Sequence, residues 1–347
     1  MEAEEKLTIK SFVNKVLGGT AQGIIIALIP NAVLSAILGY FDHIDFINMI
    51  IQGAVIFQLA TPLILGSLIA KKFDLDPMKM MITGGAAFVG SGVIKFSEES
   101  GAYIGAGTGD VINIMVTASV AVLLLMFIDN KFGSTSIIAL PIVVGIGAGI
   151  IGMLTYPFIT QITFKLGDLI NTFTELQPPL MAILISMSFA TLIISPITTV
   201  GIGLAIGLNG VSAGAAAMGV AATTYVLIVN CWKVNESGVT LAIALGGMKM
   251  MMPNLFKYPI ILLPALSTAI VSGLATALIG VAGTPESSGF GLVGLVGPLA
   301  SLDAGLNIVL VLIAWVVIPL ASALIFSFLF EKVLHLYDRE EVFKYQG

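Results

Sequence analysis

The segment Asn230–Thr240, NCWKVNESGVT, places a cluster of polar side chains between two long apolar runs. It contains the only cysteine of the chain, one of its two tryptophans, a lysine, two asparagines and a glutamate. An ionisable group costs at least ~2.5–3.5 kcal/mol at the centre of a membrane helix, so an intramembrane charge indicates a function. The fold therefore depends on whether this segment is a turn in water or a polar site at membrane depth.

The composition places the flanking runs in a lipid bilayer. The chain has 347 residues, of which 57% are hydrophobic and 10% charged, and its mean hydropathy is +1.06. A soluble domain carries about 25% charged residues. The apolar runs are also longer than the alternating strands of a membrane β-barrel, which span about ten residues. We predict an all-α polytopic membrane protein with roughly ten membrane segments, some of them re-entrant hairpins. The segments lie near 17–40, 46–70, 80–95, 111–128, 136–157, 179–200, 202–229, 240–252, 258–282 and 304–330.

The remaining composition argues against several classes of function. A single cysteine excludes a disulfide framework within the chain, and Cys231 is expected to be a small buried hydrophobe. The two histidines, His43 and His335, supply little material for a metal site or a triad, so we expect no metal, cofactor or catalytic residue. No GxxxxGK[ST] motif indicates an ATPase. The net charge of −5 lies mostly in loops and tails and gives no reason to expect a nucleic-acid partner.

Loop charge predicts the orientation of the chain in the membrane. Lysines precede the first apolar run and follow the second, whereas the loop between them, YFDHID, has no Lys or Arg. Positive residues collect on the cytoplasmic side. We therefore expect a cytoplasmic N-terminus, with YFDHID and the acidic loop Ser97–Asp110 outside. The polar segment 331–347 is expected to be a cytoplasmic tail. Met1–Lys15 is charged and amphipathic, and no cleavable signal is evident.

The sequence divides into two halves. We expect an N-terminal transmembrane half over 1–158 and a substrate-binding transmembrane half over 179–330. The connector 159–178 has apolar residues at helical spacing, with Lys165, Asp168 and Glu175 between them. This pattern predicts an amphipathic helix in the membrane interface.

Two runs in the second half predict broken helices. SPITTVGIGLAIGLNG (195–210) and AGTPESSGFGLVGLVGP (282–298) contain too many Gly, Pro, Thr and Ser residues for plain lipid-facing helices. Irregular backbone at membrane depth is tolerated only where protein buries it or where it lines a wet cavity, and broken segments are a common way to build a solute site. Small residues can instead serve close helix packing, which we favour for GIGAGIIG (145–152). The candidate ligands in the broken runs are Thr198, Thr199, Glu286 and Ser287.

The charged residues of the second half identify further candidates. Glu236 and Glu286 each lie in a Gly/Ser turn between apolar stretches. A carboxylate accepts hydrogen bonds from hydroxyl groups and a glycine lets a ligand approach the backbone, which suits a sugar or polyol. Trp232 and Lys233 are either interface anchors or pocket lining. Only six charged residues occur between Leu176 and Phe330: Lys233, Glu236, Lys249, Lys257, Glu286 and Asp303.

The run VNESGVTLAIALGGMKMMMPNLFKYPIILLPALSTAIVSG (234–273) resembles the EIIC membrane components of the bacterial phosphotransferase system, in their glucose/lactose-type superfamily. There an N-x-N-E-P-like turn precedes an apolar hairpin and an N-P-like step. Asn235 and Glu236 match the turn, and Pro253-Asn254 loosely matches the step. PPLMAILISMSF (178–189) is similar to the start of the family's substrate half. LGGTAQGIIIALIPNAVLSAIL (17–38) and GGAAFVGSGV (84–93) are closest to an EIIC-like branch that includes the perfringolysin O regulator-like membrane proteins.

The resemblance implies a homodimer in the bacterial cytoplasmic (inner) membrane, with its interface in the N-terminal half. It implies re-entrant hairpins around one sugar in the C-terminal half, Glu236 as a sugar ligand, and a separate EIIB protein as phosphoryl donor. Two departures stand out. Ser237 replaces the family's proline after the glutamate, and no histidine occurs in 194–210, where the family's sugar-contacting histidine is expected. A histidine relays the hydroxyl proton during phosphoryl transfer, so solute binding is expected without a phosphotransfer group in this chain.

Three functions are consistent with these patterns. The first is an EIIC-like transporter of a sugar or related small polar solute that works by alternating access, with or without phosphorylation. The second is a membrane sensor or regulator that keeps the EIIC fold. The third is an ion- or proton-coupled transporter of a small metabolite, in which Lys233 and Lys249 compensate an anionic charge.

Overall fold

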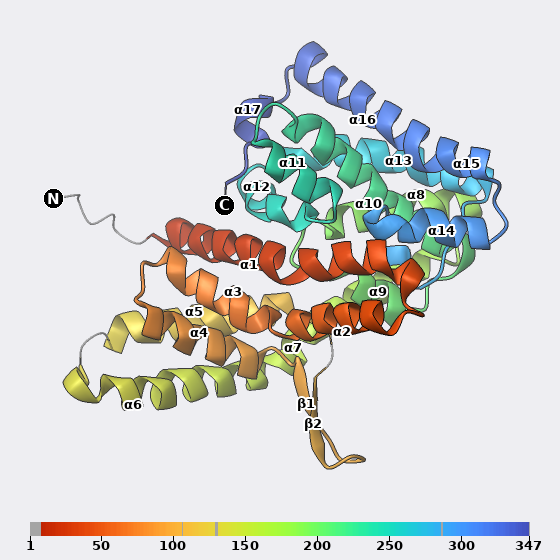
Figure 1. The fold of residues 1–347 in the computed structure, drawn as a ribbon. Coiled ribbons are helices and arrows are strands. Elements are labelled where there is room, and N and C mark those ends of the chain that lie inside the picture. The colour runs from red at the N-terminus through yellow and green to blue at the C-terminus, as the bar shows by residue number, and fades with distance from the viewer. Residues whose placement is uncertain (1–7, 106, 129–130, 286, 347) are drawn as a thin grey trace. The chain divides into compact units, whose positions relative to one another are not determined.

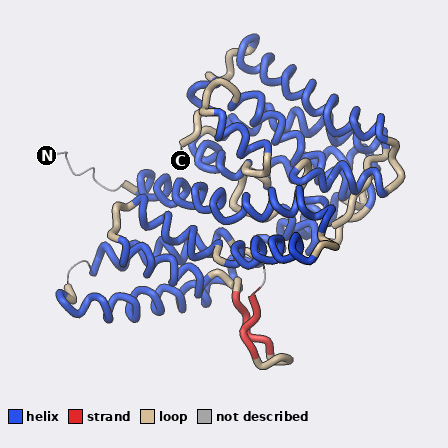
Figure 2. The backbone as a smooth tube through the Cα atoms, in the orientation of Figure 1, coloured by secondary structure: helices blue, strands red, loops and turns tan. Residues whose placement is uncertain are grey.

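The computed structural model describes residues 8–105, 107–128, 131–285 and 287–346. Helices make up 77% of the structure, which confirms the all-α class (Figure 2). The chain forms two compact units, which we call unit 1 and unit 2. Unit 1 comprises 8–28 and 55–159, and unit 2 comprises 29–54 and 160–346. All of the candidate solute-binding residues belong to unit 2.

Unit 1 is built from helices that begin at strong start signals. Pro62 opens one helix, and Asp76 caps the next by accepting from the backbone N–H of Lys79 at 3.0 Å. This backbone hydrogen bond lowers the pKa of the Asp76 carboxyl. The helices of unit 1 are α3 (Thr61–Lys72), α4 (Pro77–Gly90), α5 (Val111–Ile128) and α6 (Ser136–Leu140). Three more helices run from one unit into the other: α1 (Ile9–Leu38), α2 (Asp45–Leu59) and α7 (Gly147–Phe173).

A buried asparagine joins three helices of unit 1. Asn113, on α5, is fully buried, and its Nδ2 donates to the carbonyls of Gly90 at 2.6 Å and Gly152 at 2.8 Å. Its Oδ1 accepts from the hydroxyl of Thr155 at 2.8 Å. A Cβ at Gly90 would come within 2.8 Å of the Gly152 Cα. The two glycines therefore let α4 and α7 approach closely enough for one side chain to bond both.

The one two-stranded sheet among the described residues also lies in unit 1. Strand β1 (Ile94–Ser97) pairs antiparallel with β2 (Ala102–Gly105), and this hairpin, which connects α4 to α5 in the chain, extends away from the helices (Figure 1). Phe96 and Tyr103 face each other across it with ring centroids 5.3 Å apart. The segment Ser97–Asp110, which we expected to be an outer loop, therefore contains β2. The sequence analysis predicted no strand there.

Unit 2 surrounds a central buried helix. Its remaining helices are α8 (Pro178–Leu192), α9 (Thr199–Ala205), α10 (Gly210–Cys231), α11 (Ser237–Ala244), α12 (Met252–Lys257), α13 (Leu262–Ile279), α14 (Val296–Asp303), α15 (Ile308–Leu312), α16 (Ile318–Phe328) and α17 (Arg339–Val342). Most of α10 is buried, and it packs with α8, α13 and α16. Small residues allow this: a Cβ at Gly219 would overlap the carbonyl of Ser186 on α8. Buried hydroxyls link neighbours, as Ser186 Oγ donates to the Ala269 carbonyl at 2.9 Å.

Six helices in the described residues are long and apolar enough to cross a membrane when the continuous runs Gly133–Phe173 and Ile308–Val333 each count as one helix, or seven if the bent pair α2–α3 counts as one span. The roughly ten segments expected from sequence are not confirmed. The difference arises because several apolar runs form helices too short to span, such as Pro178–Leu192 with 15 residues. The first part of the connector 159–178 prolongs α7 to Phe173, and Pro178 then opens α8.

Replacing Asn113 by leucine tests the link within unit 1. The variant removes the three hydrogen bonds of the buried Asn113 side chain, so we expect the free energy of unfolding to fall by about 1–3 kcal/mol. Thermal unfolding of the detergent-purified protein measures the effect. Asn171→Leu, at an exposed position on α7, is the matched control and should leave the melting temperature nearly unchanged. Equal melting of Asn113→Leu and the wild type would show that Asn113 does not stabilise unit 1.

Candidate functional site

The first candidate feature is a break between α8 and α9, and we call this break together with the first residues of α9 the first break (193–201). Pro196 cannot continue a helix. The Ser195 side chain binds the backbone on both sides of the break: its Oγ donates to the Leu192 carbonyl at 2.8 Å and accepts from the Ile197 N–H at 3.1 Å. Thr198 then caps α9, with Oγ1 accepting from the Gly201 N–H at 3.3 Å. The run that the sequence predicts to be broken is therefore broken at its start.

A second break (280–295) follows α13. Gly280 ends that helix at φ +81°, a left-handed conformation that favours glycine. Thr284 and Ser287 then form a tight turn, in which Ser287 Oγ accepts from the Thr284 N–H at 2.8 Å and donates to the Thr284 carbonyl at 3.0 Å. Leu295 adopts φ +59° just before α14 begins. The predicted break in this run is present, and Glu286 lies outside the described residues.

The two breaks are in direct contact. Thr199 Oγ1 donates to the carbonyl of Gly289 at 2.9 Å, although the residues are 90 positions apart. A Cβ at Gly289 would overlap the backbone nitrogen of Val200. Gly210 and Gly283 also exchange backbone hydrogen bonds of 3.0 Å. The irregular segments of unit 2 therefore satisfy part of each other's hydrogen bonding.

Lys249 supplies donors to the first break. It lies on a 3₁₀ turn, 248–251, between α11 and α12. Its ammonium donates to the carbonyl of Ser195 at 2.6 Å and to that of Ile197 at 2.7 Å. Among the described residues no carboxylate forms an ion pair with it. A cation thus lies on two carbonyls of the break itself, where no helix supplies backbone donors.

Asn235 of the opening segment and Asn254 on α12 bind the C-terminal segment (337–346). Asn235 donates from Nδ2 to the Phe343 carbonyl at 2.8 Å and accepts at Oδ1 from the Tyr345 N–H at 2.7 Å. Asn254 is fully buried, and its Nδ2 donates to the carbonyls of Val342 at 2.8 Å and Lys344 at 2.7 Å. Both amides are therefore engaged by backbone more than 80 residues away in sequence.

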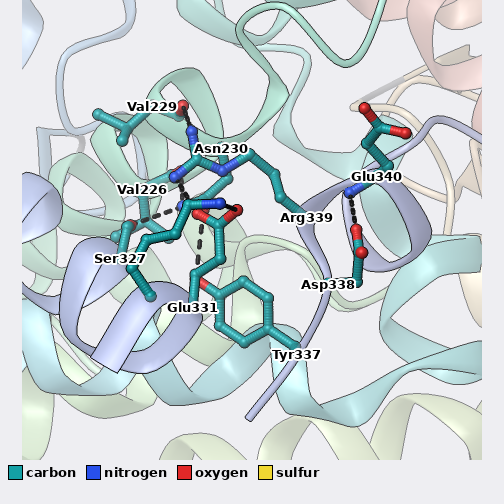
Figure 3. Close-up of polar contacts among 10 residues, drawn as sticks. Val226, Val229, Asn230, Ser327, Glu331, Tyr337, Asp338, Arg339 and Glu340 are labelled. Carbon is teal, nitrogen blue, oxygen red and sulfur yellow. Dashed lines mark hydrogen bonds and ion pairs between the residues drawn. The ribbon is translucent and has the colours of Figure 1, made fainter. Parts of the chain in front are cut away.

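A buried polar network fixes the start of that segment (Figure 3). Asn230 donates from Nδ2 to Ser327 Oγ at 2.7 Å and accepts at Oδ1 from the Tyr337 hydroxyl at 3.2 Å. Arg339 pairs with Glu331 and donates to the Val229 carbonyl at 3.4 Å. Burial raises the pKa of the Tyr337 hydroxyl to about 12, so the group keeps its proton at neutral pH.

The structure places the predicted site residues in two groups. Thr198, Thr199 and Ser287 lie at the joined breaks, where Thr198 is exposed and the other two are buried. Asn235 and Asn254 lie against the C-terminal segment. Glu236 is exposed at the start of α11, and its side chain does not cap that helix. Trp232 is 60% exposed, and Lys233 is exposed at φ +70°.

Two contributions were missed by the sequence analysis. The contact of Lys249 with the first break was not expected, although Lys249 is the one charged residue in the apolar run between Ser237 and Leu255. The C-terminal segment was expected to be a polar tail, yet Phe343 is fully buried and Val342 nearly so. The apolar pair Val342-Phe343 within a charged segment was the available signal.

The helices that are long enough to cross a bilayer define a multi-pass helical membrane protein. The phosphotransferase-system EIIC family matches residues 14–344, almost the whole chain, and the protein belongs to that family. This confirms the resemblance in the sequence and makes the chain an EIIC-type component of sugar transport. No curated protein and no solved structure matches it.

A paired set of glycine substitutions tests the contact between the breaks. In Gly289→Ala the new methyl overlaps the backbone at Val200, so we expect the free energy of unfolding to fall by about 1–3 kcal/mol. Gly238→Ala is the control, because nothing lies within 4 Å of a Cβ there. Alanine inside α11 should leave stability unchanged or raise it by about 0.5–1 kcal/mol. Equal thermal unfolding temperatures for the two variants would contradict the close contact.

Proposed function

We propose that this EIIC-type chain carries a sugar or related small polar solute across the membrane, with unit 2 holding the solute and moving by alternating access. The direct contact between the two helix breaks, through Thr199 and Gly289, is the observation that carries the proposal. Breaks of this kind bring hydroxyl groups, carbonyls and amide N–H groups together where regular helices offer none.

The chemistry of the breaks suits a hydroxyl-rich solute. Thr198 and Thr284 are exposed, one on each break. Thr198 Oγ1 accepts from Gly201, which leaves its hydroxyl proton for a ligand. Glu236 is exposed and accepts from no described group, so its carboxylate is available to the hydroxyls of a sugar. We propose Thr198, on the first break, and Glu236, at the start of α11, as direct ligands, with Thr199 and Ser287 shaping the breaks.

The remaining predicted residues take supporting roles in this proposal. Trp232 and Lys233, both exposed beside Glu236, line the approach to it. Asn235 and Asn254 fix the segment that carries Glu236, because their amides bind the C-terminal backbone. Glu286 follows Pro285 in the turn of the second break by sequence, and we propose it as a further ligand.

We propose that phosphorylation is supplied by a separate EIIB protein and not by a group in this chain. Its two histidines, His43 and His335, lie outside both broken runs. We further propose a homodimer in the bacterial inner membrane, with its interface in the N-terminal half and both termini in the cytoplasm. Lysine clusters at 6–15 and 71–79 support this orientation.

A second candidate function is a membrane sensor that keeps the EIIC fold. The absence of histidine from 194–210 favours it, because a sensor needs solute binding and no proton relay. Incubating the reconstituted protein with phosphorylated EIIB and radiolabelled sugars separates the two. Sugar phosphate formed in a protein-dependent way supports the transporter and excludes a sensor without transfer chemistry.

Glu236→Gln tests the proposed solute ligand. Loss of a charged hydrogen-bond acceptor should weaken solute binding by roughly tenfold or more, since such bonds contribute about 1.5–3 kcal/mol. Uptake by proteoliposomes, with a panel of hexoses, disaccharides and hexitols, measures it. Glu175→Gln, an exposed change outside both breaks, is the control and should match the wild type. Uptake of an identified solute that is equal in all three proteins would remove Glu236 from the site.

A further inference from the structure

The α11–α12 hairpin (234–257) is a part of unit 2 whose start and turn both have positive backbone angles φ. It begins after Lys233, at φ +70°, and turns at Gly246, at φ +118°. Pro259 follows its last residues. Its two helices have only 8 and 6 residues, too few for stability without tertiary contacts. Moving segments usually hinge at a few residues in loops or at the ends of helices and strands, where the backbone angles φ and ψ change. The stability of the hairpin therefore depends on its contacts with residues outside it.

The C-terminal segment (337–346) is one of those holds. Four hydrogen bonds of 2.7–2.8 Å join its backbone to the side chains of Asn235 and Asn254, one near each end of the hairpin. Phe343 is fully buried, with its ring 5.5 Å from that of Tyr337. Lys257 also donates to the side chain of Gln346 at 3.0 Å. The segment thus binds both ends of the hairpin at once.

This contact leaves two polar groups unsatisfied. Asn254 Oδ1 and the Tyr345 hydroxyl are buried without a hydrogen-bond partner in the described residues. Backbone carbonyls cannot satisfy Asn254 Oδ1, because they carry no proton to donate. A buried unpaired polar group favours any state in which water reaches it. Two such groups at one contact mark it as a place where the structure opens at lower cost than its helical core.

We propose that the C-terminal segment is a releasable latch on the α11–α12 hairpin. In the latched state seen here, Asn235 and Asn254 bind the segment. On release, the hairpin moves about Lys233 and bends at Gly246, and both amides become accessible beside Glu236. The latch is a property of the fold and does not depend on the transport proposal.

Cys231 reports the state of the latch. It is fully buried at the end of α10, with Sγ 3.6 Å from the carbonyl of Phe343 and 4.0 Å from Sδ of Met251. One contact belongs to the C-terminal segment and the other to the hairpin. Because it is the only cysteine of the chain, its alkylation measures opening at this place alone. The rate of labelling follows the population of the open state when opening and closing are fast.

The experiment is alkylation of Cys231 by N-ethylmaleimide in the full-length purified protein, followed by intact mass. We expect slow labelling of the wild type and labelling at least ~10-fold faster in Phe343→Ala, whose segment loses its buried anchor. Phe343→Leu, which keeps an apolar side chain, should label at a rate between the two. Asn254→Ala removes two latch bonds from the hairpin side and should also accelerate labelling.

Phe189→Ala is the matched control. Phe189 is as deeply buried as Phe343 but lies on α8, away from the C-terminal segment. Its loss should lower the melting temperature while leaving the labelling rate close to that of the wild type. The proposal is overturned if Phe343→Ala and Asn254→Ala label at the wild-type rate. It is equally overturned if Phe189→Ala labels as fast as Phe343→Ala, since Cys231 would then be reached by general unfolding.

Discussion

The hydrogen-bonding demand of broken backbone inside a membrane protein is the constraint on which unit 2 depends. A helix satisfies its own backbone, but a break frees carbonyls and N–H groups that lipid cannot bind. Unit 2 has two breaks, and protein groups meet the demand of each. Lys249 donates two hydrogen bonds to the carbonyls of the first break, and Thr199 donates to the second. Each partner comes from a distant part of the sequence, so these bonds fix how the elements of unit 2 assemble.

This demand explains the composition of the surrounding helices. The breaks can touch only if the helices that carry them pack closely. Small residues allow this close packing because they add no side-chain atoms between the backbones. Gly219 on α10 lies against α8, and Gly289 lies against Val200. The α11–α12 hairpin then has a double role. It brings Lys249 to the first break and Asn235 and Asn254 to the C-terminal segment. The chemistry of the breaks and the position of the C-terminus are thereby linked through one short hairpin.

The sequence predicted what hydropathy and local chemistry determine. The all-α membrane class and the two helix breaks followed from apolar runs and from Pro/Thr/Ser-rich interruptions, and the EIIC family followed from the resemblance of the run 234–273 to its members. The number of spans did not, because hydropathy does not reveal where α8 ends short of a full crossing. The partners of Asn235 and Lys249 were also beyond reach, since they lie 108 and 54 residues away and leave no local pattern. Polarity identified both residues as unusual, and only the fold shows what they bind.

The central claim is that the two joined breaks hold the solute. Hydrogen–deuterium exchange of the reconstituted protein, with and without saturating sugar from the uptake panel, tests it most directly. The account predicts that a bound sugar slows amide exchange in peptides covering 193–201 and 280–289 together, while peptides from α5 of unit 1 stay unchanged. Slowed exchange in unit 1 alone, or in neither break with a sugar that is demonstrably transported, would contradict the claim.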